Sequence, residues 1–437
     1  MKIITSIFII LLLCSLNSFP NDIKITQYSI TADFTKDSNS ADITAECIFK
    51  KDSALTEFIL LLNHGVKIKS IDGNYITPFA PWMVKIDHKF KGKDSLLIEL
   101  PQNFKNHADV YIKFQYSFPV NIYTDSINVL DRGHRWYPII PDNIAPFKLI
   151  CTIPKGFTSF CVFNLHENII NGTGYEHTWQ CTYPVFKIPL IIYREYIYSF
   201  YDSDFSGKFF GLHYFKNDSL KADTIIQKAK GILNFCNNYI GAFGYHEIKY
   251  IEIPGLEGMN IGSGIIMAGA NDLKYISNGY YDALYLTCIQ QWFGARVFAK
   301  YGSPGFWLLS LSLPHYIRML YIKESQGEEA FNKELTGRME KYELFAGTEK
   351  DVPITDIDYI NTQEKGQVLY IKGPYIFYKL HMLMGDEPWH KFIRELYVEY
   401  AGKVMSLDDL KSTLKKYDPD DKILEIFNNM ITKTGMV

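Results

Sequence analysis

The sequence predicts an α+β fold of two domains, in which an antiparallel β-sandwich-like domain precedes a mainly helical domain. Between residues 22 and 203, apolar and aromatic side chains alternate with polar ones or form short runs, as they do in strands. From about Ser219 onward, apolar positions recur every three or four residues instead. Aromatic residues make up 15% of the 437 residues, which favours extended sheets. Strands first and helices later indicate an α+β fold.

The first half contains seven strong strand patterns that are separated by turn-forming clusters of Asp, Asn, Ser, Gly and Pro. The expected strands are 25–34, 41–49, 57–68, 95–101, 108–118, 147–154 and 185–201. The expected turns are 37–40, 72–74, 141–143 and 171–174. These patterns predict a β domain over residues 22–203.

Helical spacing then continues to the end of the chain, with Ser, Asp or Gly at plausible helix ends. The expected helices are 219–241, 280–300, 327–345, 365–385, 386–402 and 405–417. Two short strands, 246–254 and 262–269, are expected after the first helix. The second domain is therefore predicted over residues 204–437.

Overall charge argues against a nucleic-acid partner. The protein has 45 Lys and Arg against 48 Asp and Glu, which gives a formal charge of -3. No basic run of the kind that binds nucleic acid is present.

The N-terminus has the pattern of a secretory signal peptide over residues 1–18. Lys2 precedes an apolar run from Ile3 to Leu13, and small polar residues follow. The run is too short for a membrane-spanning helix, which needs about 20 apolar residues. A lipid anchor at Cys14 is an alternative, although Leu13 stands where a lipoprotein signal has a small residue. We therefore expect an exported protein, periplasmic, envelope-bound or secreted, without a transmembrane span in the mature chain.

Six cysteines remain after this segment. They are Cys47, Cys151, Cys161, Cys181, Cys236 and Cys288. An even number in an exported protein permits disulfides, but no close-spaced framework is present. Buried free thiols are the expected state.

Three segments of the second half, in order, resemble motifs of one enzyme family. GLEGMNIGSGII (255–266) stands in the place of a G-A-M-E-N substrate loop. LTCIQQWFGARV (286–297) matches the last letters of an H-E-x-x-H-Q-W-F-G helix, and LYIKGPYIFYKLHML (369–383) is similar to a Y-x-K-G helix. The protein thus resembles the zinc aminopeptidases of the membrane alanyl aminopeptidase family, which are gluzincin metallopeptidases. Weaker similarities extend this resemblance over nearly the whole mature chain. They lie at 135–156, 306–313 and 427–437.

The resemblance implies an aminopeptidase N-terminal-like β domain followed by a thermolysin-like peptidase domain. It also implies a zinc ion held by two histidines one helical turn apart and a later glutamate. In this sequence the first histidine falls on Leu286, the general-base glutamate on Thr287 and the second histidine on Gln290. The third ligand falls on Leu309 or Ser310. We expect no bound zinc, because none of these side chains is a good ligand or base.

No alternative zinc helix is present, since no two of the 11 histidines are separated by three, four or five residues. His246 is interpreted as a strand-edge histidine, and His381 and His390 as surface or core histidines of late helices. On the helix expected from 280 to 299, one face carries a stripe that is interpreted as core. Its members are Ala283, Leu286, Gln290, Phe293 and Val297.

Part of the substrate cleft survives in the resemblance. Tyr370 matches the family's catalytic tyrosine, which stabilises an oxyanion, although packing within a helix explains it equally well. Gly258, Met259 and Asn260 match the substrate loop, and Asn260 replaces the glutamate that binds a free α-amino group. Glu257 is interpreted as a surface residue. With Gln290 and Tyr370, these loop residues make up the expected cleft.

Three functions remain open. The first is a catalytically inactive homologue that binds a peptide or a protein partner through the degenerate cleft. The second is a structural scaffold subunit of an envelope complex, with a closed cleft. The third is a metallopeptidase with an unfamiliar site, for instance one that uses His315 and Glu257. Because function depends on the site rather than on the fold, the first is favoured.

Overall fold

A computed structural model describes residues 23–76, 82–123, 127–162, 165–170, 172, 174–194, 197–205, 208–215, 221–357 and 365–435. The expected signal peptide and Cys14 lie outside these residues. Contacts divide the protein into two units. One comprises the residues up to Ser159 with Leu165–Thr182 and Pro189–Arg194, and the other comprises Phe160–Asn164, Tyr183–Ile188 and Glu195–Val437.

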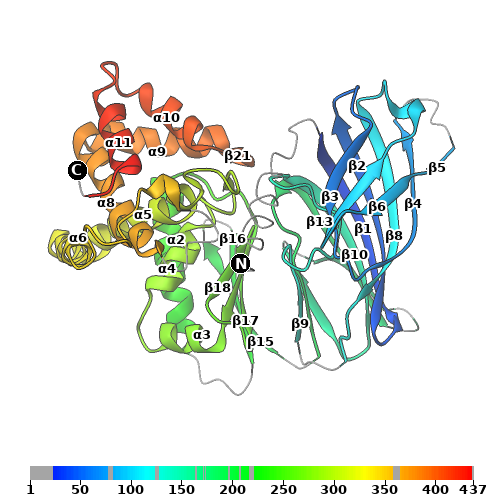
Figure 1. The fold of residues 1–437 in the computed structure, drawn as a ribbon. Helices are drawn as coiled ribbons and strands as arrows, with labels where there is room; N and C mark the ends of the chain where they lie inside the picture. Colours follow the sequence, from blue (N-terminus) through cyan, green and yellow to red (C-terminus); the bar gives the residue numbers. More distant parts are fainter. Residues whose placement is uncertain are drawn as a thin grey trace, which may run out of the picture. The chain divides into compact units, whose positions relative to one another are not determined.

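The first unit is built on an eight-stranded sheet in the order β12-β13-β10-β1-β2-β8-β4-β5 (Figure 1). The strands are β1 (Ile23–Asp37), β2 (Ser40–Lys51), β4 (Lys67–Tyr75), β5 (Val84–Lys85), β8 (Asp109–Pro119), β10 (Ala145–Pro154), β12 (Leu165–Ile170) and β13 (Gly174–Val185). Alternate residues of β2, from Ala41 to Phe49, are buried because successive side chains point to opposite faces. One pair is parallel, β1 with β10, so the domain is not wholly antiparallel.

Two three-stranded sheets complete this unit, in the orders β3-β7-β6 and β11-β14-β9. Their strands are β3 (Glu57–Leu61), β6 (Asp87–Phe90), β7 (Ser95–Glu99), β9 (Ile127–Leu130), β11 (Thr158–Cys161) and β14 (Leu190–Tyr193). A 3₁₀ turn, Gln102–Phe104, precedes β8. Phe49 of β2 packs against Phe58 of β3, with their ring centroids 5.2 Å apart. Such contacts build the apolar interior of a layered β domain.

The turn expected at 72–74 is wrong, because Gly73 lies inside β4. It pairs with Ile112 of β8. A Cβ on Gly73 would lie 2.8 Å from the Tyr111 carbonyl oxygen and 2.6 Å from Ile86 Cδ1. Glycine is therefore required here by the close approach of neighbouring strands and not by a turn.

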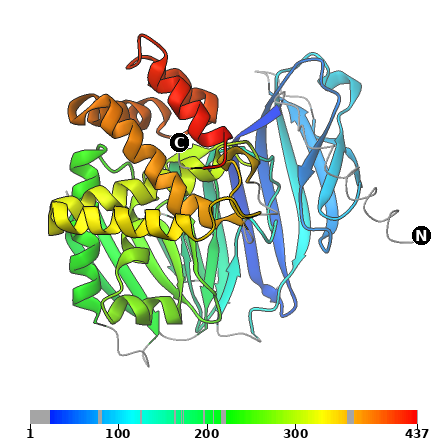
Figure 2. The same cartoon turned by 60° about the vertical axis from the view of Figure 1, so that its left-hand side comes forward.

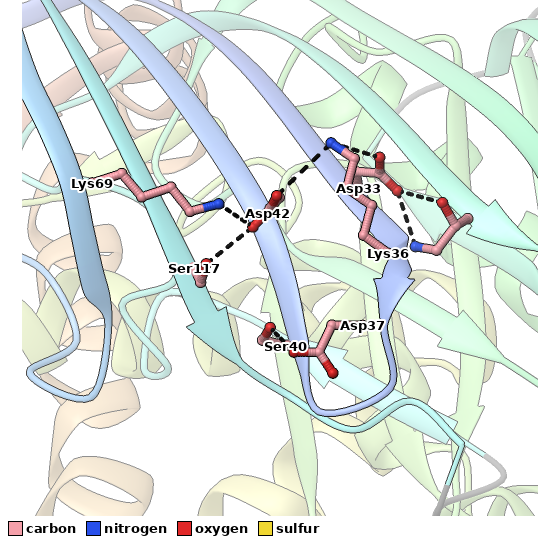
Figure 3. Close-up of polar contacts among 8 residues, drawn as sticks. Asp33, Lys36, Asp37, Ser40, Asp42, Lys69 and Ser117 are labelled. Atoms are coloured by element: carbon pink, nitrogen blue, oxygen red, sulfur yellow. Dashed lines mark hydrogen bonds and ion pairs between the residues drawn. The ribbon is translucent and has the colours of Figure 1, made fainter.

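The hairpin of β1 and β2 carries a polar network on its exposed face (Figure 3). Asp42 accepts hydrogen bonds from Lys69 Nζ at 2.5 Å and from Ser117 Oγ at 3.0 Å. Lys36 Nζ lies 3.3 Å from an Asp33 oxygen and 3.8 Å from an Asp42 oxygen. These contacts link side chains of β1, β2, β4 and β8 across the strands.

The second unit has a five-stranded sheet in the order β15-β16-β17-β19-β18. Its strands are β15 (Ile197–Phe205), β16 (Lys208–Phe215), β17 (Glu247–Ile253), β18 (Met259–Gly262) and β19 (Ile265–Gly269). β15 pairs with β16, and the longest continuous stretch of the second unit runs from Glu195 to Val437.

Helices pack beside this sheet and continue to the C-terminus (Figure 1). They are α2 (Ala222–Tyr239), α3 (Ala270–Ser277), α4 (Asp282–Ile289), α5 (Leu313–Gln326), α6 (Glu328–Glu343), α8 (Gln367–Met384), α9 (Asp386–Tyr400), α10 (Leu407–Lys415) and α11 (Lys422–Thr432). A π-helical turn, Leu308–Ser312, precedes α5, and a 3₁₀ turn spans Ile354–Asp356. Two short strands, β20 (Val297–Ala299) and β21 (Lys403–Met405), pair in parallel. Helices α5, α6 and α8 lie side by side (Figure 2).

The helix expected at 280–300 is shorter than predicted. Helix α4 ends at Ile289, and Gly294 adopts a φ of 136° that favours glycine. Val297 then enters β20. The proposed apolar stripe is therefore wrong beyond Gln290, because Phe293 and Val297 are buried outside the helix.

The six cysteines of the described residues are buried thiols that form no disulfide, as the sequence analysis expected. Among the described helices, none combines the length and apolar composition that crossing a membrane requires.

Candidate functional site

The last turn of α4 and the residue that caps it carry two of the positions where the family resemblance expects zinc ligands. The backbone N–H of Gln290 donates to the carbonyl oxygen of Leu286 at 2.9 Å, so the two residues lie one helical turn apart. Gln290 Nε2 donates to the carbonyl oxygen of Ser310 at 2.9 Å. Folding therefore brings Gln290 together with the turn that would supply the third ligand.

The remaining positions of this set are engaged in local bonds or buried. Thr287 Oγ1 lies 2.9 Å from the Ala283 carbonyl oxygen and 3.1 Å from that of Leu284, to which it donates. Ser310 Oγ donates to the carbonyl oxygen of Phe306 at 2.7 Å. Leu309 is 2% exposed. Each side chain is satisfied as a structural residue in a helical turn.

These residues do not fit a zinc ion. Leu286 and Leu309 have no lone pair, and the Gln290 side chain, held through Nε2 by a main-chain acceptor, offers only an amide oxygen, a poor partner for zinc. Within the described ranges, no group of three or more His, Cys, Asp or Glu side chains is placed to hold a metal ion. The residues at these positions therefore support no reaction step through a metal.

The substrate loop of the resemblance is held by a lysine that the sequence analysis missed. Lys187 Nζ donates to Asn260 Oδ1 at 2.9 Å and to the Ile261 carbonyl oxygen at 3.2 Å. The neighbouring Met259 receives a hydrogen bond at its sulfur from the Tyr250 hydroxyl, 3.2 Å away. The position expected to bind an amine is thus occupied by a neutral amide beside an ammonium group, which repels a second cation.

Tyr370 lies on α8 and is 45% exposed. Its ring centroid is 5.2 Å from that of His315, edge to face, and burial raises the pKa of its phenol. The Tyr370 carbonyl oxygen accepts a hydrogen bond from Arg338 Nη1. The half-exposed Tyr370 side chain agrees with a residue at a cleft, which is one of the two interpretations left open by the sequence.

A cleft of about 1160 Å³ opens beside Tyr370 in the second unit. Its walls come from α5, α6, α8 and residues 344–350, and it includes Asp282 at the start of α4. Of the expected cleft residues, Tyr370 alone lines it. Gly258, Met259, Asn260 and Gln290 do not, so the structure separates the loop residues from this cavity.

Arg318 and Arg338 line this cleft, and sequence reasoning missed both. They approach the same carboxylate, Glu334, from α5 and from the next turn of α6. The i to i+4 spacing of Glu334 and Arg338 was visible in the sequence as an ordinary helix pair. The partner from α5 depends on how two helices pack, and no local pattern reports that.

The other candidate residues have structural roles. His246 is exposed directly before β17, and Glu257 is exposed in the loop before β18. His390 Nε2 lies 2.8 Å from the Tyr239 carbonyl oxygen, and His381 contacts Tyr316 and Asp386 through its two nitrogens. These histidines agree with the surface and core interpretations.

The fold is similar to solved zinc metallopeptidases. The M1 zinc metallopeptidase from Deinococcus radiodurans superposes with a TM-score of 0.76 at 12% identity, over 94% of this chain and 95% of that chain. A mutant of the same enzyme bound to a Tyr-Ser-Ala substrate gives a TM-score of 0.75 at 12% identity, over 95% and 96%. A two-domain M1 zinc metallopeptidase mutant bound to L-tryptophan gives 0.76 at 12% identity, over 96% of each chain.

No protein-family profile and no curated protein sequence matches this protein. At 12% identity, the similarity shows the fold alone, which is the two-domain fold of M1 metallopeptidases. Function must therefore be argued from the protein's own residues.

Proposed function

We propose that this protein is a catalytically inactive homologue of zinc aminopeptidases that binds a peptide, or a peptide segment of a protein partner, in the cleft beside Tyr370. One combination of observations carries the proposal: the positions expected to bind zinc carry no suitable ligands, and a cleft is open beside Tyr370. Gln290 Nε2 donates to the Ser310 carbonyl oxygen at the place where the zinc ligands of the family would converge. A cleft of about 1160 Å³ is open next to Tyr370. A concave site of this size accommodates a short peptide.

Loss of catalysis has a direct chemical basis. Hydrolysis by this family's chemistry needs a metal, a base for water and an oxyanion donor. Thr287 in place of the base has its hydroxyl bonded within its own helix. A remaining phenol such as Tyr370 has no oxyanion to stabilise without an activated water.

The scaffold alternative requires a closed cleft, and the cavity beside Tyr370 favours the binding function instead. The metallopeptidase alternative needs ligands such as His315 and Glu257 to meet. His315, which lies in α5, instead packs on Tyr370 of α8. Glu257 is exposed in the loop before β18. We extend the proposal to an exported protein on the pattern of Lys2 and the apolar run from Ile3 to Leu13.

Gly337 allows the binding function to be tested. It lines the cleft from α6, and a Cβ there would meet no atom within 4 Å. Gly337→Phe places a ring in the cavity, whereas Gly337→Ala leaves it open and favours the helix by about 1 kcal/mol. Both variants should fold, and circular dichroism checks this.

The measurement is equilibrium dialysis of mixed hexapeptides with the mature protein, quantified by mass spectrometry. We expect retention by the unmodified protein and by Gly337→Ala, and loss of retention in Gly337→Phe. Zinc analysis and hydrolysis of aminoacyl arylamides accompany it. One tightly bound zinc per molecule with chelator-sensitive hydrolysis would overturn the proposal, and so would peptide retention that Gly337→Phe does not change.

A further inference from the structure

The cleft beside Tyr370 is more positive than the protein as a whole. It is lined by five basic and three acidic side chains, although the complete sequence has a formal charge of -3. The basic residues are Arg318, Lys333, Arg338, Lys341 and Lys350, and the acidic residues are Asp282, Glu334 and Glu349. Clustered charge of one sign in a concave surface attracts ligands of the opposite sign.

The two arginines are fixed in position by their partners. Glu334 Oε1 accepts hydrogen bonds from Arg318 Nη2 and, at 2.6 Å, from Arg338 Nη2. Arg318 Nη1 donates to Asp282 Oδ1 at 2.6 Å. The Asp282 side chain is 80% exposed, whereas that of Arg318 is 3% exposed. A ligand can therefore replace Asp282 on Arg318 at little cost, because Asp282 returns to water.

Arg318 Nε and three lysines of this cleft have no carboxylate partner in the described part of the protein. Arg318 Nε is shielded from solvent and has no hydrogen-bond partner among the residues that the structure describes. Leaving a buried charged donor without an acceptor costs stability, which favours the arrival of an acceptor from outside. Lys333, Lys341 and Lys350 are exposed, and within the described part of the protein no carboxylate lies within ion-pair distance of them.

We propose that the cleft binds a peptide carboxylate. The planar guanidinium of Arg318 makes the inner contact with it, and the positive charges of Lys333, Lys341 and Lys350, the outer field, surround this contact. Arginine is suited to this role because its guanidinium matches carboxylate geometry. The carboxylate belongs either to the C-terminus of a peptide or to an Asp or Glu side chain. This inference rests on the proposed peptide-binding function and adds the chemical class of the ligand.

Two further observations agree with an anionic ligand. Burial, followed by the charges of Arg338 and Arg318, lowers the pKa of His315 beside Tyr370, and of these causes the two arginine charges oppose added positive charge there. At the substrate loop, which does not line this cleft, Lys187 beside Asn260 opposes binding of a peptide amino group. Neither place therefore favours the free amine that aminopeptidases recognise.

The test uses four hexapeptide mixtures with Ala, Leu, Phe and Ser at the variable positions. The first has two glutamates and blocked ends, and the second has no charged side chain but a free C-terminal carboxylate. The third has two lysines and blocked ends, and the fourth is neutral with blocked ends. Equilibrium dialysis at low and at physiological salt gives the bound fraction of each.

A triple variant of the outer field, Lys333→Gln with Lys341→Gln and Lys350→Gln, removes three exposed charges and should not affect folding. Its control is Lys274→Gln with Lys403→Gln and Lys433→Gln, which removes three exposed lysines that do not line the cleft. Both variants have the same net charge. We expect the first to weaken binding of acidic peptides roughly tenfold and the control to stay within about twofold.

Preferential binding of the first mixture assigns the site to acidic side chains, and preferential binding of the second assigns it to a C-terminus. If all four mixtures bind equally, or if both triple variants weaken binding equally, the carboxylate inference is overturned and peptide binding stands. If no mixture binds, the proposed function fails as well. Preference for the lysine mixture would reverse the sign of the inference and overturn it.

Discussion

At the residue scale, the second unit contains a buried histidine with a perturbed titration. His213 of β16 is 0% exposed, and its Nδ1 lies 2.8 Å from Ser199 Oγ on the neighbouring strand. Lys249, 2.9 Å from Glu247 in a buried ion pair, adds a positive charge nearby. Burial, with a smaller contribution from Lys249, lowers the pKa of His213 to about 3.

This histidine should make the protein less stable in mild acid. In the unfolded state His213 takes up a proton below about pH 6.5, whereas in the folded state it does so only near pH 3. The unfolded state binds more protons between these values, so the free energy of unfolding decreases as the pH falls from 6.5 towards 3. From pH 7 to pH 5 the expected loss from this group is about 2 kcal/mol.

His213→Leu tests this by urea unfolding at pH 5, 7 and 8. The variant should be less stable than the parent at pH 7, because it loses the contact with Ser199, but its decrease from pH 7 to pH 5 should be about 2 kcal/mol smaller. Between pH 8 and pH 7 the two proteins should change in parallel. If the free energy of unfolding decreased equally in the parent and in the variant between pH 7 and pH 5, His213 would be able to take up a proton in the folded state, which would contradict the prediction.

At the element scale, the candidate site depends on a close approach between α8 and the π-helical turn Leu308–Ser312. Ser312 Oγ donates to the Leu369 carbonyl oxygen at 2.8 Å. A Cβ on Gly373, one turn later in α8, would overlap the Ser312 side chain. The glycine of the Y-x-K-G segment is therefore explained by helix packing, which holds Tyr370 at the rim of the cleft.

Gly373→Ala should destabilise the fold by about 2–4 kcal/mol, because the added methyl group forces the two elements apart. Helix propensity alone would give the opposite sign, since alanine favours a helix by about 1 kcal/mol over glycine. Thermal and urea unfolding measure the change. Adding Ser312→Gly to this variant removes the overlap and should recover most of the loss, whereas Ser312→Gly alone should be destabilising. A stable Gly373→Ala variant would contradict this packing.

At the scale of the whole molecule, the two-domain fold is shared with M1 zinc metallopeptidases at 12% identity, over 94% of this chain. A fold of this kind depends on strand alternation and on buried helix faces, which many apolar residues satisfy. A metal centre depends on a few ligands that contribute little to those patterns. Divergence can therefore remove the donors and leave the architecture intact.

Zinc binding should be recoverable if α4 and the turn before α5 keep a peptidase-like placement. Leu286→His, Thr287→Glu and Gln290→His place the motif on the last turn of α4, and a glutamate at Ser310 supplies the third ligand. Ser310 is preferred over Leu309, because it is half-buried and Gln290 already reaches its backbone. Calorimetric zinc titration should show one site per molecule.

The matched control keeps Gln290 and carries the other three changes, and it should bind zinc at least about tenfold more weakly. Any recovered peptidase activity should be slow, since Asn260 offers no carboxylate to a substrate amine. Asn260→Glu should help only when Lys187→Gln is added, because Lys187 would otherwise neutralise the new carboxylate. Absence of zinc binding in a folded variant would mean that these elements have moved apart.

The sequence by itself determined the fold class, the burial of its six later cysteines and the residue types at the positions where the family resemblance expects zinc ligands. Alternation over β1 and β2, and helical spacing over α2, α6 and α9, are local patterns that burial of one face imposes on each element. Leu286 offers no lone pair, Thr287 is no usable base near neutral pH and Gln290 offers only a poor ligand, whatever the fold does with them.

Only the tertiary structure decided what depends on residues far apart in the sequence. The parallel pairing of β1 with β10, the neighbours of Gly73 and the end of α4 at Ile289 come from partners that no local window contains. The same holds for Arg318, which lies 16 residues before Glu334 and meets it only because α5 packs against α6. Periodicity reports which face of an element is buried, but the side chains that converge on a cleft are set by how elements pack against one another.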